Sequence, residues 1–301
     1  MPLWIAVSVT AALFQCWRTA MQQKLRGQMS VNAAGFVRYL YGAPTSAIVL
    51  LLVLMGTGEP LPQANAPFLM YCALGGLGQI LATNLLIMSF GYRNFAVGTA
   101  YSKTETVQTA ILAFLVLNES LSPFAWFGIV IGLTGVLTLS LAGRGLDARE
   151  LARATVQPAA LCGLGSGLVF SFTIVFIKLG NHALVSDSLV VRGLYALAIS
   201  NAMQIVMQGG YLLWREPAEL KKAFTTWRTS MWVGTLSGLG SACWFTGFAI
   251  ADVALVRAVG QVEIVFTLLF SRFYLKETLK PGDVAGLVLV VFGVLLIILL
   301  H

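Results

Sequence analysis

Apolar runs long enough to cross a lipid bilayer follow one another along this chain, with only short polar connections between them. A helix that spans the hydrocarbon layer needs about 20 mostly apolar residues, so 301 residues leave room for about ten such helices and little else. Only 10% of the residues are charged, whereas a water-soluble domain needs about a quarter. We therefore expect an integral membrane protein, in contact with the lipid bilayer and without a soluble catalytic domain.

The breaks between the apolar runs predict ten transmembrane helices. Proline supports several of the boundaries, because Pro123, Pro158 and Pro281 stand where a helix is expected to begin. The first residues lack the charged start of a signal peptide and are expected to remain as the first helix. The predicted fold class is all-α, with helices at about 3–24, 32–56, 66–90, 95–118, 122–142, 157–180, 186–213, 229–250, 253–275 and 281–300.

Lysine and arginine are distributed unevenly among the predicted connections. The odd-numbered connections carry many basic residues and the even-numbered ones carry none. Because cytoplasmic connections are enriched in lysine and arginine, both termini are expected outside the cytoplasm, with the protein in the plasma (inner) membrane. The net charge of +7 is then a topology signal, and no nucleic-acid partner is expected.

An internal repeat divides the chain into two halves. The stretch NESLSP at 118–123 resembles KETLKP at 276–281, and the same displacement aligns Glu105 with Glu263. A second displacement aligns Arg38 with Arg192, near the start of each half. The first two helices and the fourth and fifth are therefore predicted to be duplicated.

Each predicted copy contains five helices. Because five is an odd number, the second copy must cross the membrane in the opposite direction. We expect a first repeat over 1–145, a cytoplasmic linker over 146–156 and a second, inverted repeat over 157–301, arranged around a central cavity. Inverted repeats are typical of secondary transporters, in which two related halves expose a midplane site to either side in turn.

Two short stretches in each half carry a resemblance to a known family. ETV at 105–107 and NESL at 118–121 correspond to EIV at 263–265 and KETL at 276–279. With its ten predicted helices, the chain resembles the drug/metabolite transporter superfamily, specifically its EamA-type members. The resemblance implies an exporter of amino acids or related metabolites. It also implies a cavity lined by the first, third, fourth, sixth, eighth and ninth helices.

The fourth predicted helix carries a polar stripe. Tyr101, Glu105 and Gln108 lie four and three residues apart and share one face, while Lys103 points elsewhere. Charged groups are costly in lipid and are therefore candidates for function. Glu105 is expected either to accept the amino group of a substrate or to hold two helices together, and Lys103 either to bind a carboxylate or to pair within the protein. Together with Glu263, these two residues are candidates for ion pairing or for coupling to protons.

The ninth predicted helix supplies Gln261 for the opposite wall, whereas Arg257 is expected to reach water at the outer boundary. Further candidates are amides, hydroxyls and aromatic rings in the first, third, sixth and eighth helices. Polar groups at mid-span need partners or water, and aromatic faces suit an apolar ligand with a charged head. The full set of further substrate-binding candidates is Gln15, Trp17, Gln79, Thr83, Asn84, Ser166, Trp244 and Phe245.

We therefore predict a monomeric secondary transporter that exports small amphipathic metabolites, such as hydrophobic or aromatic amino acids, by alternating access. Transport of another metabolite or of a cationic drug-like compound is the alternative within this class, and a membrane enzyme or structural subunit is the alternative outside it. The sequence shows neither the cluster of acids nor the paired histidines that an enzyme would need. No cofactor or metal site is predicted, since the cysteines have no CxxC spacing and no nearby histidine.

Overall fold

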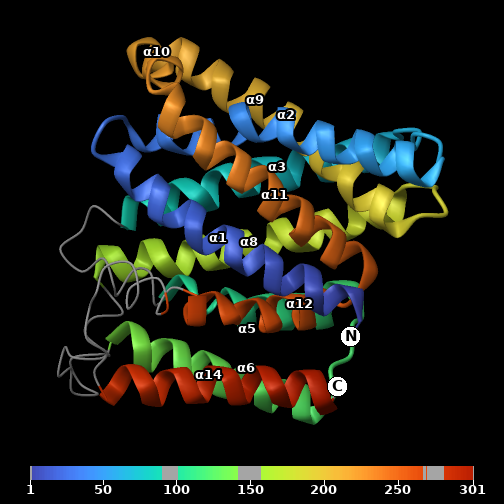
Figure 1. Ribbon diagram of the computed structural model, residues 1–301, viewed down its shortest axis with the longest axis vertical. Helices are drawn as coiled ribbons and strands as arrows, with labels where there is room; N and C mark the ends of the chain where they lie inside the picture. The colour runs from blue at the N-terminus through green and yellow to red at the C-terminus, as the bar shows by residue number, and fades with distance from the viewer. Residues whose placement is uncertain (1, 90–100, 142–156, 267–268, 270–280, 301) are drawn as a thin grey trace.

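The computed structural model describes residues 2–89, 101–141, 157–266, 269 and 281–300, and every regular element within these ranges is a helix. Most of the helices lie roughly parallel or antiparallel to one another, as stacked rods, in Figure 1. The start of the first helix and the end of the last lie on the same side of the stack (Figure 1). The predicted all-α fold is confirmed for the described residues.

The first half of the chain contains α1 (Leu3–Arg26), α2 (Val31–Thr57), α3 (Ala66–Ser89), α5 (Glu105–Leu117) and α6 (Pro123–Leu141). Local chemistry sets several of their ends. The side chain of Ser30 accepts a hydrogen bond from the backbone N–H of Ala33 and caps the start of α2. Gly58 ends the same helix in the left-handed conformation, with φ at 69°.

The second half contains α8 (Pro158–Ala183), α9 (Leu189–Arg215), α10 (Pro217–Thr225), α11 (Trp227–Ile250), α12 (Val253–Val259) and α14 (Pro281–Leu300). The short helix α10 was not predicted, because nine residues between two long helices are too few for a span. Pro217 at its first position and Glu219 in its first turn are both typical of helix starts. The predicted helix at 253–275 is also interrupted, since α12 passes into a 3₁₀ turn at Gly260–Val262 before residues 263–266 are helical again.

Some of the predictions fall on residues that the structure does not describe. They are the linker at 146–156, the start of the helix at 95–118, the end of the helix at 253–275 and most of the KETLKP stretch. Several of the basic residues on which the predicted orientation depends also lie outside the described residues. They are Arg93, Arg144, Arg149, Arg153, Lys276 and Lys280.

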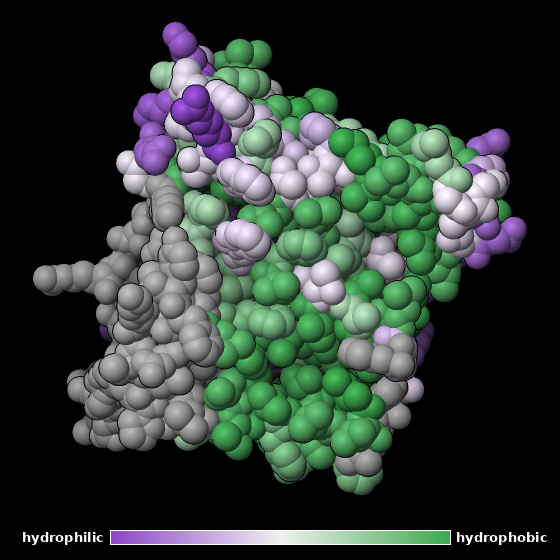
Figure 2. Space-filling view, in the orientation of Figure 1, coloured by the Kyte–Doolittle hydropathy of each residue, from purple (hydrophilic) through white to green (hydrophobic). Residues whose placement is uncertain are grey.

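The outer surface of the described helices is suited to lipid. Five of these helices, α2, α3, α8, α9 and α11, are long and apolar enough to cross a membrane, and α5, α6 and α14 contain shorter apolar segments. Large side chains such as Leu52 and Val206 are 63% and 74% exposed. Figure 2 shows apolar side chains across the middle of one face, with hydrophilic side chains gathered near α10 and at the opposite end of the helices. This is the distribution of a multi-pass membrane protein.

Two long helix pairs build the centre of the bundle, α1 with α11 and α3 with α8, while α2 packs against both α9 and α11. At one edge, α6 packs along α14 through glycines. A Cβ atom at Gly293 would lie 2.6 Å from the carbonyl oxygen of Gly128, and one at Gly135 would lie 2.8 Å from that of Gly286. Only residues without a side chain allow the two backbones to approach so closely.

Candidate functional site

A cavity of about 90 Å³ lies within the bundle. One water needs roughly 10–15 Å³ by the same measure, so the space corresponds to several waters or part of a small organic molecule. Its walls come from α1, α2, α3, α8, α11 and α12, and from the segment that begins α5. Both halves of the chain therefore contribute. The helices implied by the family resemblance all take part, and α2 is added to them through Arg38.

Part of the cavity wall is apolar. Phe170, Ile174 and Ile177 are contributed by α8, and Phe245 and Phe248 by α11. Phe245 was predicted as a substrate-binding residue, and it lines the cavity while being only 2% exposed. Such a surface can bind the apolar part of a ligand by excluding water from both.

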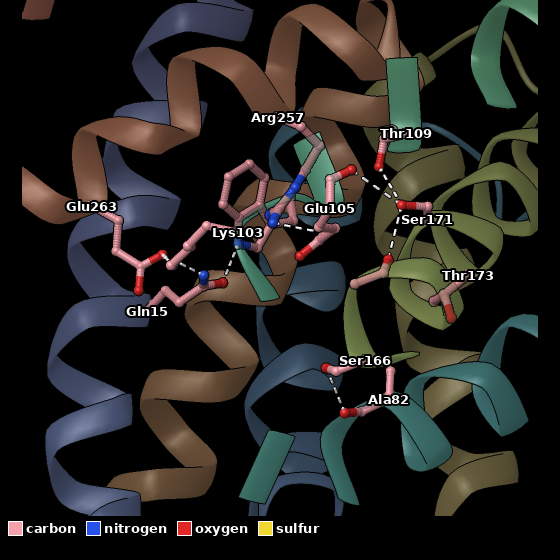
Figure 3. Close-up of polar contacts among 12 residues, drawn as sticks. Gln15, Ala82, Lys103, Glu105, Thr109, Ser166, Ser171, Thr173, Arg257 and Glu263 are labelled. Atoms are coloured by element: carbon pink, nitrogen blue, oxygen red, sulfur yellow. Dashed lines mark hydrogen bonds and ion pairs between the residues drawn. The ribbon is translucent and has the colours of Figure 1, made fainter. Parts of the chain in front are cut away.

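A chain of polar contacts runs along one side of the cavity. The side-chain amide of Gln15 donates from Nε2 to Oε2 of Glu263 at 2.7 Å and accepts at Oε1 from Nε1 of Trp244 at 3.0 Å. The Nζ atom of Lys103 lies 2.8 Å from the same Oε2. Figure 3 shows Gln15, Lys103 and Glu263 directed toward one another. Four predicted residues are thus brought together, and Lys103 pairs within the protein.

A second ion pair joins Glu105 to Arg257, with Oε1 and Nη2 2.7 Å apart and both side chains about nine-tenths buried. The guanidinium of Arg257 also lies over the ring of Trp244, 4.5 Å from its centroid. The carbonyl oxygen of Glu105 accepts a hydrogen bond from Ser171 (Figure 3). The expectation that Arg257 reaches water at the outer boundary was wrong, because Glu105 offers it a carboxylate inside the bundle.

Two further arginines line the cavity and were not among the predicted site residues, Arg18 and Arg38. Arg38 is 4% exposed and donates to the hydroxyls of Thr83 at 2.6 Å and Ser237 at 3.2 Å. The Nε atom of Arg18 is buried and has no hydrogen-bond partner. Neither arginine forms an ion pair with a carboxylate of the described residues.

A sequence signal for these arginines existed. Arg18 lies three residues after Gln15, on the same face of α1, and Arg38 lies inside α2, where a charge is costly. Neither was predicted as a site residue, and Arg38 was used to align the two halves of the chain.

Several predicted residues hold helices together. Ser166 is fully buried and donates to the carbonyl oxygen of Ala82, which fastens α8 to α3 (Figure 3). Asn84 donates to the side chain of Asn32 at 2.8 Å, between α3 and α2. Gln79 lines the cavity and also accepts a hydrogen bond from Gln204 at 2.7 Å. Thr83 accepts a hydrogen bond from Arg38 and likewise connects α3 to α2.

Four other predicted residues do not line the cavity. Trp17 is 48% exposed on the outside of α1. Gln108 hydrogen-bonds to Thr104 one turn earlier, and the side chain of Gln261 packs against Gly132 of α6. Tyr101 is half-buried, outside the set of residues that lines the cavity. The polar stripe predicted on the fourth helix therefore contributes only Glu105 to the cavity. A turn at residues 103–104 separates Tyr101 from α5, and Gln108 bonds to Thr104 one turn earlier.

The described residues contain no group of three or more histidine, cysteine or acidic side chains placed to hold a metal ion. The chemistry that they do offer in the cavity is charge, amide and hydroxyl groups beside an apolar wall. Such a site can bind and orient a small molecule.

Nearly the whole chain is similar to known proteins. The model of the EamA-like transporter family matches residues 2–141 and residues 157–299. A solved structure, described only as the crystal structure of a protein, is 17% identical in sequence and aligns with a TM-score of 0.71 over 97% of this chain and 94% of the other. At this level of identity, the structural likeness shows the fold alone.

Proposed function

The chain belongs to the EamA-like transporter family, a family of membrane transporters, and on this premise we propose that it is a secondary transporter that moves small amphipathic metabolites by alternating access. The observation that carries the proposal is a cavity inside the bundle whose apolar and charged walls come from both halves of the chain. A site built in this way can be exposed to one side of the membrane or the other when the two halves move.

The ion pairs of the cavity support such a movement. Glu105 of the first half pairs with Arg257 of the second, and Lys103 of the first half pairs with Glu263 of the second. Rearrangement of the halves would have to break or exchange these contacts. Two arrangements separated by exchangeable ion pairs are a common basis for conformational switching.

We also propose the ten-span architecture with two inverted five-helix repeats over 1–145 and 157–301. Two observations support it. In the proposed repeat, α8 is the counterpart of α1, and α11 is the counterpart of α3. The packing of α1 against α11 then has an equivalent in the packing of α8 against α3, and both contacts are present. The contact between Gly128 and Gly293 likewise becomes the contact between Gly286 and Gly135 when the aligned positions are exchanged. The family match in two segments agrees with this division.

For its orientation, we propose that both termini face away from the cytoplasm in the plasma (inner) membrane, and that one copy of the chain forms one transport unit. The start of α1 and the end of α14 lie on one side of the bundle, and α10 lies on the other (Figure 1). Helix α10 carries Lys221 and Lys222, which favours a cytoplasmic position for its side.

Export of hydrophobic or aromatic amino acids fits the apolar wall beside charged groups. The amino group of such a substrate would need a carboxylate, however, and the carboxylates of Glu105 and Glu263 are already paired. The same argument applies more strongly to a cationic drug-like compound. Among amphipathic solutes, those with an acidic group are favoured.

The proposal is tested with the purified full chain in liposomes. Counterflow is measured for a panel of hydrophobic and aromatic amino acids and of carboxylic acids of similar size, with and without a pH gradient. Counterflow of at least one amphipathic solute is expected, and its absence throughout the panel would exclude transport of these classes. Flux that does not depend on the pH gradient would exclude obligatory coupling to protons.

A further inference from the structure

The charges that line or adjoin the cavity do not balance. Among the described residues, its cations are Arg18, Arg38, Lys103 and Arg257, whereas its carboxylates are those of Glu105 and Glu263. Lys103 and Arg257 take one carboxylate each. Two guanidinium groups are therefore left without an ion-pair partner among the described residues.

Arg18 is the less satisfied of the two. It makes no hydrogen bond to any described residue, and its Nε atom is buried without a partner. Glu263 forms no ion pair with Arg18, and its Oε2 atom accepts from Lys103 and Gln15. Arginine cannot shed its charge as a buried lysine can, so this cation remains in the cavity wall at every physiological pH.

Arg38 holds its position through neutral groups. Thr83 and Ser237 accept from Nη1 and Nε, while a guanidinium has five N–H donors, so further donors remain for a ligand. Arg18 and Arg38 line the same cavity, so their like charges repel each other. A fold that keeps two mutually repelling, unpaired cations beside a cavity is stabilised when an anion enters.

We infer that the cavity binds a small organic anion, and that Arg18 and Arg38 bind its acidic group. This inference rests on the proposed function and names the substrate class of the same site. A carboxylate or phosphate accepts two parallel hydrogen bonds from one guanidinium, which fits the donors that these residues present. The apolar part of the anion lies against the wall that includes Phe170, Ile174 and Phe245.

The test uses probes that share one phenyl ring and differ in charge. Phenylpyruvate and phenyl phosphate are anions, phenylalanine is a zwitterion and phenethylamine is a cation. Binding of each to the purified full chain is measured by calorimetric titration, and uptake is measured in proteoliposomes. Tighter binding and faster uptake of one or both anions are expected, and the two anions together show which acidic group is preferred.

The outcomes separate the inference from the proposed function. Uptake of phenylalanine or phenethylamine without uptake of either anion overturns the inference and leaves the transporter proposal standing. Failure of all four probes to bind and to be taken up counts against both.

Variants connect the result to the two arginines. Arg18→Gln and Arg38→Gln are each expected to weaken anion binding by roughly tenfold or more, through loss of a charge-assisted bidentate contact. Arg18→Gln is the cleaner variant, because Arg18 makes no hydrogen bond within the described protein. Arg215→Gln is the matched control, since Arg215 is exposed and lies over Trp214. Unchanged anion affinity in folded Arg18→Gln and Arg38→Gln protein overturns the inference.

Arg18→Lys and Arg38→Lys carry the test if the glutamine variants do not fold. They keep the positive charge and lose the forked pair of donors, so anion binding is expected to weaken without being abolished. Affinity equal to that of the unaltered protein in both lysine variants would contradict the bidentate contact.

Discussion

Nη2 of Arg257 lies 2.7 Å from Oε1 of Glu105, and this ion pair joins α12 of the second half to the first turn of α5 in the first. Lys103 and Glu263 form the reciprocal contact, 2.8 Å apart. Each half therefore supplies one cation and one carboxylate to the other. Glu105 and Glu263, which the repeat aligns, each form an ion pair with a cation of the other half. The two cations, Arg257 and Lys103, do not occupy aligned positions.

The Glu105–Arg257 pair is expected to behave as a coupled unit. Removing one partner of a buried pair costs about 3–5 kcal/mol, because the other charge stays behind. Glu105→Gln is expected to cost more than Arg257→Gln, since it adds a third unpaired cation to Arg18 and Arg38. The double variant should be less destabilised than the sum of the single variants.

The two single variants and the double variant form a double-mutant cycle with the unaltered protein. The stability of each is measured by thermal unfolding in detergent, with ligand absent. Glu59→Gln serves as a control, since Glu59 forms no ion pair with any described residue. Additive effects of the two substitutions would mean that the pair contributes nothing as a pair.

Trp17 and Trp244 provide a second comparison, because sequence reasoning assigned both to substrate binding. Trp244 lines the cavity at 8% exposure and donates to Gln15, whereas Trp17 is 48% exposed on the outside of α1. Trp244→Phe removes the N–H donor that orients Gln15 and is expected to lower transport at least several-fold. Trp17→Phe is expected to leave it unchanged. Initial transport rates of the two variants are compared in proteoliposomes at equal protein content. Equal losses of rate in both variants would contradict a specific role of Trp244 in the cavity.

The glycine contact between α6 and α14 predicts a difference between two alanine substitutions. A Cβ at Gly293 would lie 2.6 Å from the backbone oxygen of Gly128, whereas one at Gly210 of α9 would meet no atom within 4 Å. Gly293→Ala must force the helices apart and is expected to destabilise by about 1–3 kcal/mol. Gly210→Ala should be neutral or stabilise by up to about 1 kcal/mol, as alanine favours a helix. The thermal midpoint in detergent should therefore fall with Gly293→Ala and stay unchanged or rise with Gly210→Ala. Similar shifts in the two variants would argue against the close crossing.

Apolar runs and prolines were enough to predict most helices of this protein, since an apolar run of about 20 residues can satisfy its own backbone hydrogen bonds in lipid as a helix. The site was harder to predict. Gln15, Glu105 and Trp244, which line the cavity, were chosen as candidates because polar or aromatic groups at mid-span are unusual. Helical spacing could not show that Lys103 turns toward Glu263, because that depends on the interruption at residues 103–104 and on a partner 160 positions away.

Charge was also interpreted too simply. The positive charge of the chain was interpreted as a topology signal, and Arg18 and Arg38 were not considered as site residues. Whether an arginine within a helix faces a loop or a cavity depends on which helices surround it, and the sequence of one helix does not contain that information.

A cluster at the α10 side predicts a pH effect on stability. Glu219 accepts hydrogen bonds from Lys222 at 2.6 Å and from the backbone N–H of Ser30 at 2.6 Å, and both lower the pKa of its carboxyl below the ordinary value. A lowered pKa in the folded state means that the contribution to stability is complete above the ordinary carboxyl pKa. It is lost as the pH falls through the lower folded value.

Glu219→Gln is therefore expected to reduce stability near neutral pH by less than about 1 kcal/mol, since its ion pair with Lys222 is in contact with solvent. The difference from the unaltered protein should vanish toward acid. Thermal midpoints of the two proteins between neutral and acid pH provide the measurement. A difference that stays constant over this range would show that the charge of Glu219 is not involved.

The contact between Lys178 and Glu119 predicts control of access from the side on which the termini lie. Nζ of Lys178 lies 3.7 Å from Oε1 of Glu119 and donates to the carbonyl oxygen of Ala251 at 2.8 Å. Oε2 of Glu119 accepts from the backbone N–H of Val253 at 2.9 Å. These bonds join the α5–α6 connection to α8 and to the junction of α11 and α12, across the two halves.

Because this cluster closes the two halves against each other, Lys178→Met is expected to favour opening toward that side. A cysteine at Ser241, which lines the cavity, reports on it through labelling by an impermeant maleimide in protein whose native cysteines are replaced. Labelling from the side of the termini should become several-fold faster with Lys178→Met. It should stay unchanged with Lys222→Met, since Lys222 pairs with Glu219 within one exposed helix and spans no contact between halves. Equal labelling in both backgrounds would show that the Lys178 contact does not restrain the opening.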